Sequence, residues 1–86
     1  MGRMIQLWKQ RESSEEVEYL YGSSRDEAGL LRVSKHHGTV EKVRAVKGLS
    51  ESDDNFFFFQ LASAKIAMLR ETGEFPEETF NRRVVT

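Results

Sequence analysis

Apolar and polar residues alternate in four segments of the first half of the chain, with the period of two expected of half-buried β-strands. In the second of these segments, for example, Val17, Tyr19 and Tyr21 share one face. The links between the segments are short and polar, which favours antiparallel neighbours. The predicted strands span residues 4–10, 16–21, 30–34 and 39–47.

The sequence Lys-His-His-Gly at residues 35–38 predicts a hairpin loop between the third and fourth strands, closed by a glycine. With Lys35 opposite Thr39, the ladder would pair Leu31 with Val43, Val33 with Glu41, Arg32 with Lys42, and Leu30 with Arg44. This register would bring three basic residues together on one face of the sheet. They are Arg32, Lys42 and Arg44.

The pattern becomes helical after Gly48, and we expect a helix over about residues 54–72, capped by Ser52 or Asp53. The run of phenylalanines at residues 56–59 is compatible with a strand, but the alanine-rich continuation favours a helix. Gly73 is a suitable C-terminal cap. Residues 74–86 are expected to form a tail in which Phe75 and Phe80 pack back against the body.

These elements predict an α+β fold, namely a four-stranded antiparallel β-meander (ββββα) with one C-terminal helix packed on one face. A length of 86 residues fits a single domain spanning 1–86. A chain of this size buries only about 60% of its unfolded surface, so most of its large apolar residues are expected to contribute to the core.

The charge balance and the cysteine content limit the classes of function. Thirteen basic residues offset 14 acidic ones, so the net charge of −1 disfavours binding through a strongly basic surface. Because there is no cysteine, disulfides and thiolate metal sites are excluded, and a reducing, cytoplasmic location is expected. The apolar stretches are too short for a signal peptide or a membrane span, so no membrane partner is expected.

The sequence contains no recognisable catalytic or cofactor-binding motif, and we expect neither an enzyme nor a bound cofactor. The adjacent pair His36 and His37 would diverge in a turn and lacks a third ligand at a suitable spacing, so no metal site is expected. The acidic residues at 51, 53 and 54 are better explained by helix capping than by cation binding.

The functional hypothesis rests on two apolar surfaces. Trp8, Leu20 and Leu30 should project from the sheet face that the helix leaves uncovered, beside the basic residues Arg32, Lys42 and Arg44. A second apolar stripe on the helix contains Phe57, Leu61 and Met68. It is a candidate second interface, or the tail folds back and covers it.

The first surface predicts a non-catalytic interaction domain (a binding module, inhibitor or immunity-type protein) whose partner is another protein or a second copy of the chain. The alternative is an accessory nucleic-acid-binding domain that uses the basic hairpin. The basic residues also have a simpler explanation, since Glu18 on the preceding strand could pair with Arg32.

Overall fold

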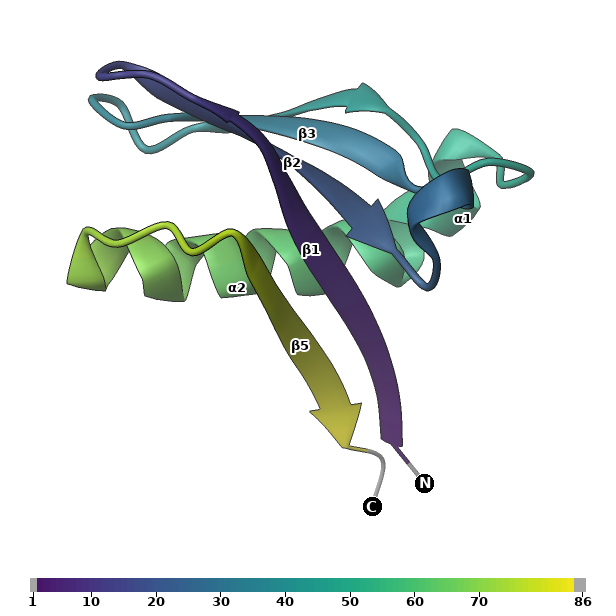
Figure 1. The fold of residues 1–86 in the computed structure, drawn as a ribbon. Helices are drawn as coiled ribbons and strands as arrows, with labels where there is room; N and C mark the ends of the chain where they lie inside the picture. The colour runs from purple at the N-terminus through teal and green to yellow at the C-terminus, as the bar shows by residue number, and fades with distance from the viewer. Residues whose placement is uncertain (1, 85–86) are drawn as a thin grey trace.

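A computed structural model describes residues 2–84 of the chain. Within these residues, five antiparallel strands form one sheet in the order β4-β3-β2-β1-β5, with the long helix α2 across one face (Figure 1). The elements are β1 (Gly2–Glu12), β2 (Glu16–Gly22), the short 3-10 helix η1 (Arg25–Glu27), β3 (Gly29–Ser34), β4 (Val40–Arg44), α1 (Glu51–Phe56), α2 (Phe58–Thr72) and β5 (Glu78–Val84). The predicted α+β class with an antiparallel sheet is confirmed, but the sheet has one strand more than expected.

The additional strand, β5, lies within the segment that we expected to be a tail. It pairs with β1 over seven residues, from Gly2 opposite Val84 to Trp8 opposite Glu78. Thr79 and Asn81 lie opposite Leu7 and Ile5 of β1, so they occupy the inner face of β5. This face therefore carries two polar residues rather than large apolar ones. A strand with a polar inner face gives no apolar alternation toward the core, which explains why the sequence pattern did not reveal it.

The helical region begins earlier than predicted and is divided in two. Ser50, rather than Ser52 or Asp53, caps α1, because its Oγ accepts a hydrogen bond from the Asp53 N–H at 3.1 Å. The backbone leaves the helical conformation at Phe57, where φ is −128° and ψ is −66°. The helix ends at Gly73 as predicted, with a φ of +78°.

The predicted register between β3 and β4 is wrong at three positions and right at one. The observed pairs are Leu30–Arg44, Leu31–Lys42, Arg32–Glu41 and Val33–Val40. The hairpin closes with the Ser34 N–H donating to the Thr39 carbonyl at 3.0 Å, one residue earlier on β3 than expected. An irregularity between Leu30 and Leu31 then restores the predicted pairing at Arg44. This shift moves Lys42 to the inner face, and β4 ends at Arg44 rather than at residue 47.

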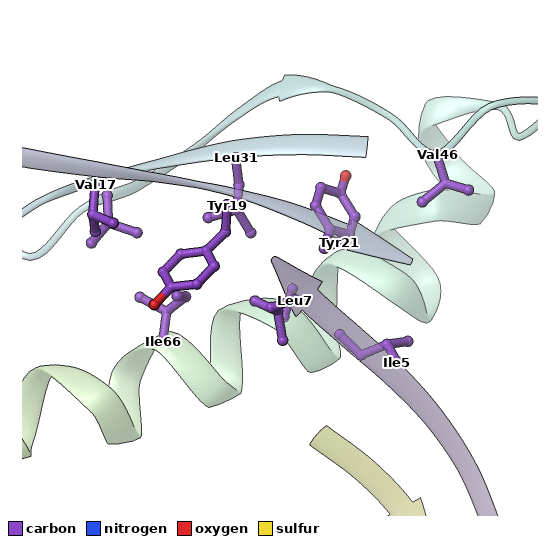
Figure 2. Close-up of a cluster of buried hydrophobic side chains, with 10 residues drawn as sticks. Ile5, Leu7, Val17, Tyr19, Tyr21, Leu31, Val46 and Ile66 are labelled. Carbon is purple, nitrogen blue, oxygen red and sulfur yellow. The ribbon is translucent and has the colours of Figure 1, made fainter. Parts of the chain in front are cut away.

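The main core lies between the inner face of the sheet and α2 (Figure 2). Alternate residues of β1, β2 and β3 supply it, and the helix contributes two buried residues one turn apart, Ala62 and Ile66. The buried members from the sheet are Ile5, Leu7, Val17, Tyr19, Tyr21, Leu31 and Val33, with Val46 from the connection after β4. Burial of this set fixes which face of each strand points away from the helix.

None of the helices within residues 2–84 is long and apolar enough to cross a membrane.

Candidate interaction surface on the outer face of the sheet

The structure brings together three of the predicted site residues on the face of the sheet that α2 does not cover. Trp8 of β1 lies opposite Leu20 of β2, and Leu20 lies opposite Leu30 of β3. Ala28, which follows η1, joins them in a second apolar cluster. Trp8 and Leu20 each keep only 9% of their surface exposed, so the cluster is a small core rather than an open patch.

Two exposed apolar residues, Met4 and Phe80, lie on the same face of the sheet as that cluster. Phe80 is opposite Gln6, and Met4 is two residues before Gln6, so both side chains share the face of Trp8. Met4 is 50% exposed and Phe80 is 51% exposed, although large apolar side chains are usually buried. We call Met4, Trp8, Leu20, Leu30 and Phe80 the outer apolar surface.

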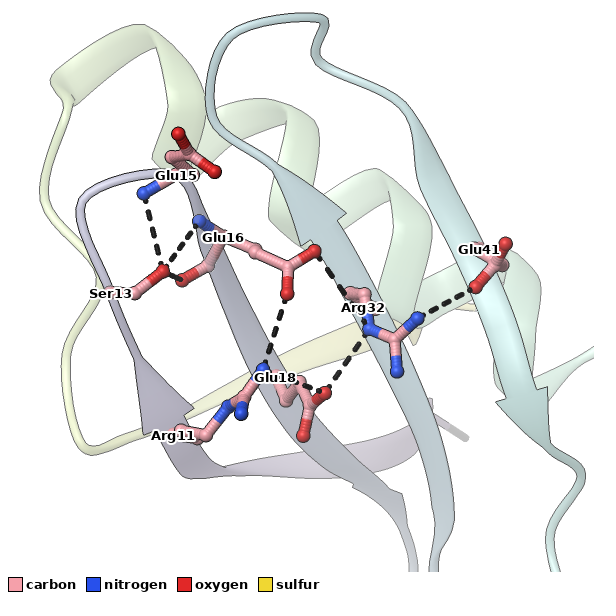
Figure 3. Close-up of polar contacts among 7 residues, drawn as sticks. All are labelled: Arg11, Ser13, Glu15, Glu16, Glu18, Arg32 and Glu41. Atoms are coloured by element: carbon pink, nitrogen blue, oxygen red, sulfur yellow. Dashed lines mark hydrogen bonds and ion pairs between the residues drawn. The ribbon is translucent and has the colours of Figure 1, made fainter.

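Arg32 does not present a free positive charge. Its guanidinium lies 3.1 Å from Glu18, 3.2 Å from Glu41 and 4.0 Å from Glu16 (Figure 3). Arg11 also lies close to Glu16 and Glu18 in this network. The hydrogen bond to Glu18 is the main reason that the pKa of Arg32 is raised. The simpler explanation of Arg32, pairing with Glu18 on the neighbouring strand, is therefore confirmed.

The other two predicted basic residues do not extend this network, so the expected basic strip does not form. Lys42 points to the inner face because of the register shift, and its Nζ lies 2.8 Å from the Oδ2 of Asp54 and 4.9 Å from the centre of the Phe59 ring. Arg44 remains on the outer side beside Leu30, where it donates to the Ala28 carbonyl at 3.2 Å. Each cation thus has its own local partner.

Asp54 is the centre of a buried polar cluster that sequence analysis interpreted only as helix capping. Its carboxylate is fully buried and accepts hydrogen bonds from the Tyr21 hydroxyl at 2.7 Å and the Val46 N–H at 3.0 Å. Burial, followed by the hydrogen bond to Asp54, raises the pKa of Tyr21. The cluster connects α1 to β2, β4 and the connection after β4. Because the carboxylate is closed to solvent, we interpret the cluster as a structural anchor.

The second predicted surface is only partly open. Phe57 and Leu61 are half-buried against the main core, whereas Met68 is 56% exposed. The segment after α2 contributes to this burial, since the Asn81 side chain donates to the Leu61 carbonyl at 2.8 Å and Phe75 packs against the core. The predicted packing of Phe75 is thus confirmed, but Phe80 points to the outer apolar surface instead.

The part of the chain that the structure describes contains no cluster of three or more histidine, aspartate or glutamate side chains able to hold a metal ion. His36 and His37 are both exposed in the β3–β4 loop. No protein-family model matches the chain, and no curated protein or solved structure matches it either.

Proposed function

We propose that this protein is a small interaction domain that binds another protein through the outer apolar surface. The observation that supports this most strongly is the exposure of Met4 and Phe80, two large apolar residues that share the outer face of the sheet with Trp8. Contiguous exposed apolar residues with an aromatic side chain are typical of protein interfaces. Phe80 is the expected anchor, with Trp8 and Leu20 as a rigid support beside it.

The charges around this surface favour a protein partner over a nucleic acid. Arg32 is surrounded by three carboxylates, and Lys42 is paired with Asp54. A phosphate backbone is bound mainly through cations that are available to neutralise it. An apolar centre beside charges that already pair with one another is better suited to a protein surface of similar polarity.

The proposal is tested by comparing the wild type and two variants for the proteins that they retain from a native cell extract. The double variant Met4→Ser/Phe80→Ser removes the exposed part of the outer apolar surface, and Met68→Ser removes an equally exposed apolar side chain from α2. A partner retained by the wild type should bind Met68→Ser equally well and the double variant at least tenfold more weakly, which corresponds to about 1.4 kcal/mol. Binding is measured by titration with the purified partner.

Circular dichroism serves as the control that both variants keep the fold. Equal affinity of the double variant and the wild type would contradict the proposal, as would the same loss in Met68→Ser.

A further inference from the structure

We infer that the partner is a second copy of this chain, paired antiparallel along the outer edge of β5. The inference rests on the proposed function and specifies its partner.

The sheet has two edges, and they differ in how well they are protected. β4 is five residues long, and its register with β3 is irregular. Short and irregular edge strands resist pairing with other chains. β5 has seven residues in an unbroken register with β1, and no other strand within residues 2–84 lies on its outer side. β5 is therefore the edge better suited to accept another strand.

Part of β5 also lies in a two-stranded ribbon. β2 ends with Gly22 opposite Gln6, so residues 2–5 of β1 pair only with residues 81–84 of β5. The ribbon extends beyond the rest of the sheet at the lower right of Figure 1. Isolated two-stranded ribbons are marginally stable in water, and although Ile5 anchors this one in the main core, a third strand would stabilise it further. Met4 and Phe80 lie in and beside this ribbon.

The hydrogen bonds between β1 and β5 show which backbone groups point outward. The Lys9 N–H donates to the Glu77 carbonyl at 2.7 Å. Hydrogen-bonded and non-hydrogen-bonded pairs alternate in an antiparallel ladder. Thr79 and Asn81 therefore direct their N–H and C=O groups to β1, whereas the backbone groups of Glu78, Phe80 and position 82 point to the outer edge.

These directions restrict how two β5 strands can pair. Outward groups must meet outward groups, so the even-numbered positions of one copy pair with even-numbered positions of the other. A twofold axis at Phe80 satisfies this rule and places the two copies of Phe80 opposite each other. It also sets Glu78 opposite position 82, where the sequence has an arginine of opposite charge. The outer apolar surfaces of the two copies would then form one continuous patch.

The solution mass tests this arrangement. The wild type should approach twice 10.0 kDa as its concentration rises, measured by light scattering or sedimentation equilibrium. Phe80→Lys and Phe80→Glu should each remain at 10.0 kDa, because each places like charges opposite each other on the axis. An equimolar mixture of the two variants should recover the dimer, since opposite charges then meet. Val43→Lys, at an apolar residue of β4 that is 45% exposed, should leave the wild-type dimer unchanged.

A wild type that stays monomeric up to about 1 mM would overturn the inference, because a dimer with a Kd of that order would be detected. Dimers of Phe80→Lys or Phe80→Glu alone would overturn it too, and so would a mixture that remains monomeric. A monomeric wild type that still binds a foreign protein through Met4 and Phe80 would overturn only the identity of the partner and would leave the proposed function intact.

Discussion

Among single residues, Asp54 is a buried charged residue whose contacts stabilise the fold. Its buried carboxylate accepts hydrogen bonds from Tyr21 and Val46 and pairs with Lys42, whose side chain is only 10% exposed. When one partner of a buried ion pair is removed, the remaining charge is left without compensation in a poorly solvated site. The loss therefore exceeds that of the hydrogen bonds alone.

We predict that Asp54→Ala lowers the free energy of unfolding by about 3–5 kcal/mol, measured by urea denaturation. The neighbouring variant Asp53→Ala is the control, because Asp53 is exposed and should lose only its favourable interaction with the helix dipole, about 1 kcal/mol or less. Equal losses in the two variants would contradict the anchoring role of Asp54.

Between elements, Glu12 at the end of β1 links the two hairpins. It accepts hydrogen bonds from Lys35, which follows β3, at 2.7 Å and from Lys9 at 2.5 Å. The bonds from Lys35 and then Lys9 lower the pKa of Glu12 below its ordinary value of 4.5. A carboxylate with a lowered pKa in the folded state stabilises the protein above its unfolded pKa, and this contribution disappears as pH falls through the folded pKa.

We therefore predict that Glu12→Gln is less stable than the wild type at neutral pH, and that the difference shrinks as pH falls from about 5 to about 2. Added salt should also reduce the difference, because Glu12 is partly exposed. Glu15→Gln, in the loop that follows β1 and outside these contacts, should have nearly the stability of the wild type at neutral pH. A difference between Glu12→Gln and the wild type that does not change with pH would rule out this contribution of the Glu12 charge. Urea denaturation across the pH range provides the measurement.

The sequence was informative wherever a strand has one apolar face. Alternation predicted the first three strands well and correctly grouped Trp8, Leu20 and Leu30, and Gly73 marked the end of the helix. The β3–β4 register was not predictable in the same way, because an irregularity near Leu30 shifts the pairing without changing the hydrophobic pattern. Lys42 was consequently placed on the wrong face.

The most exposed part of the candidate surface was missed for a different reason. Phe80 belongs to a strand that Thr79 and Asn81 make polar on its inner face, so its alternation resembles that of a polar tail. Pairing with β1, a contact distant in sequence, decides that this segment is a strand. The only local signals were Pro76, which prevents the helix from resuming after Gly73, and a single aromatic residue between polar ones.

In the molecule as a whole, the two faces of the sheet are covered to different extents. α2 covers the inner face, whereas the cluster around Trp8 closes only part of the outer face and leaves Met4 and Phe80 exposed. These residues lie next to the outer edge of β5, the less protected edge of the sheet. An interface along β5 would cover the exposed apolar residues and the edge together.

Residue-by-residue amide hydrogen exchange in β5, measured by NMR at low and high protein concentration, tests this claim most directly. In dilute protein the amides of Thr79 and Asn81 should be protected by β1, while those of Glu78 and Phe80 exchange rapidly. At high concentration all four should be protected, because the second copy engages the outward groups. Rapid exchange of the Glu78 and Phe80 amides that persists at every concentration would contradict pairing of a second copy along β5.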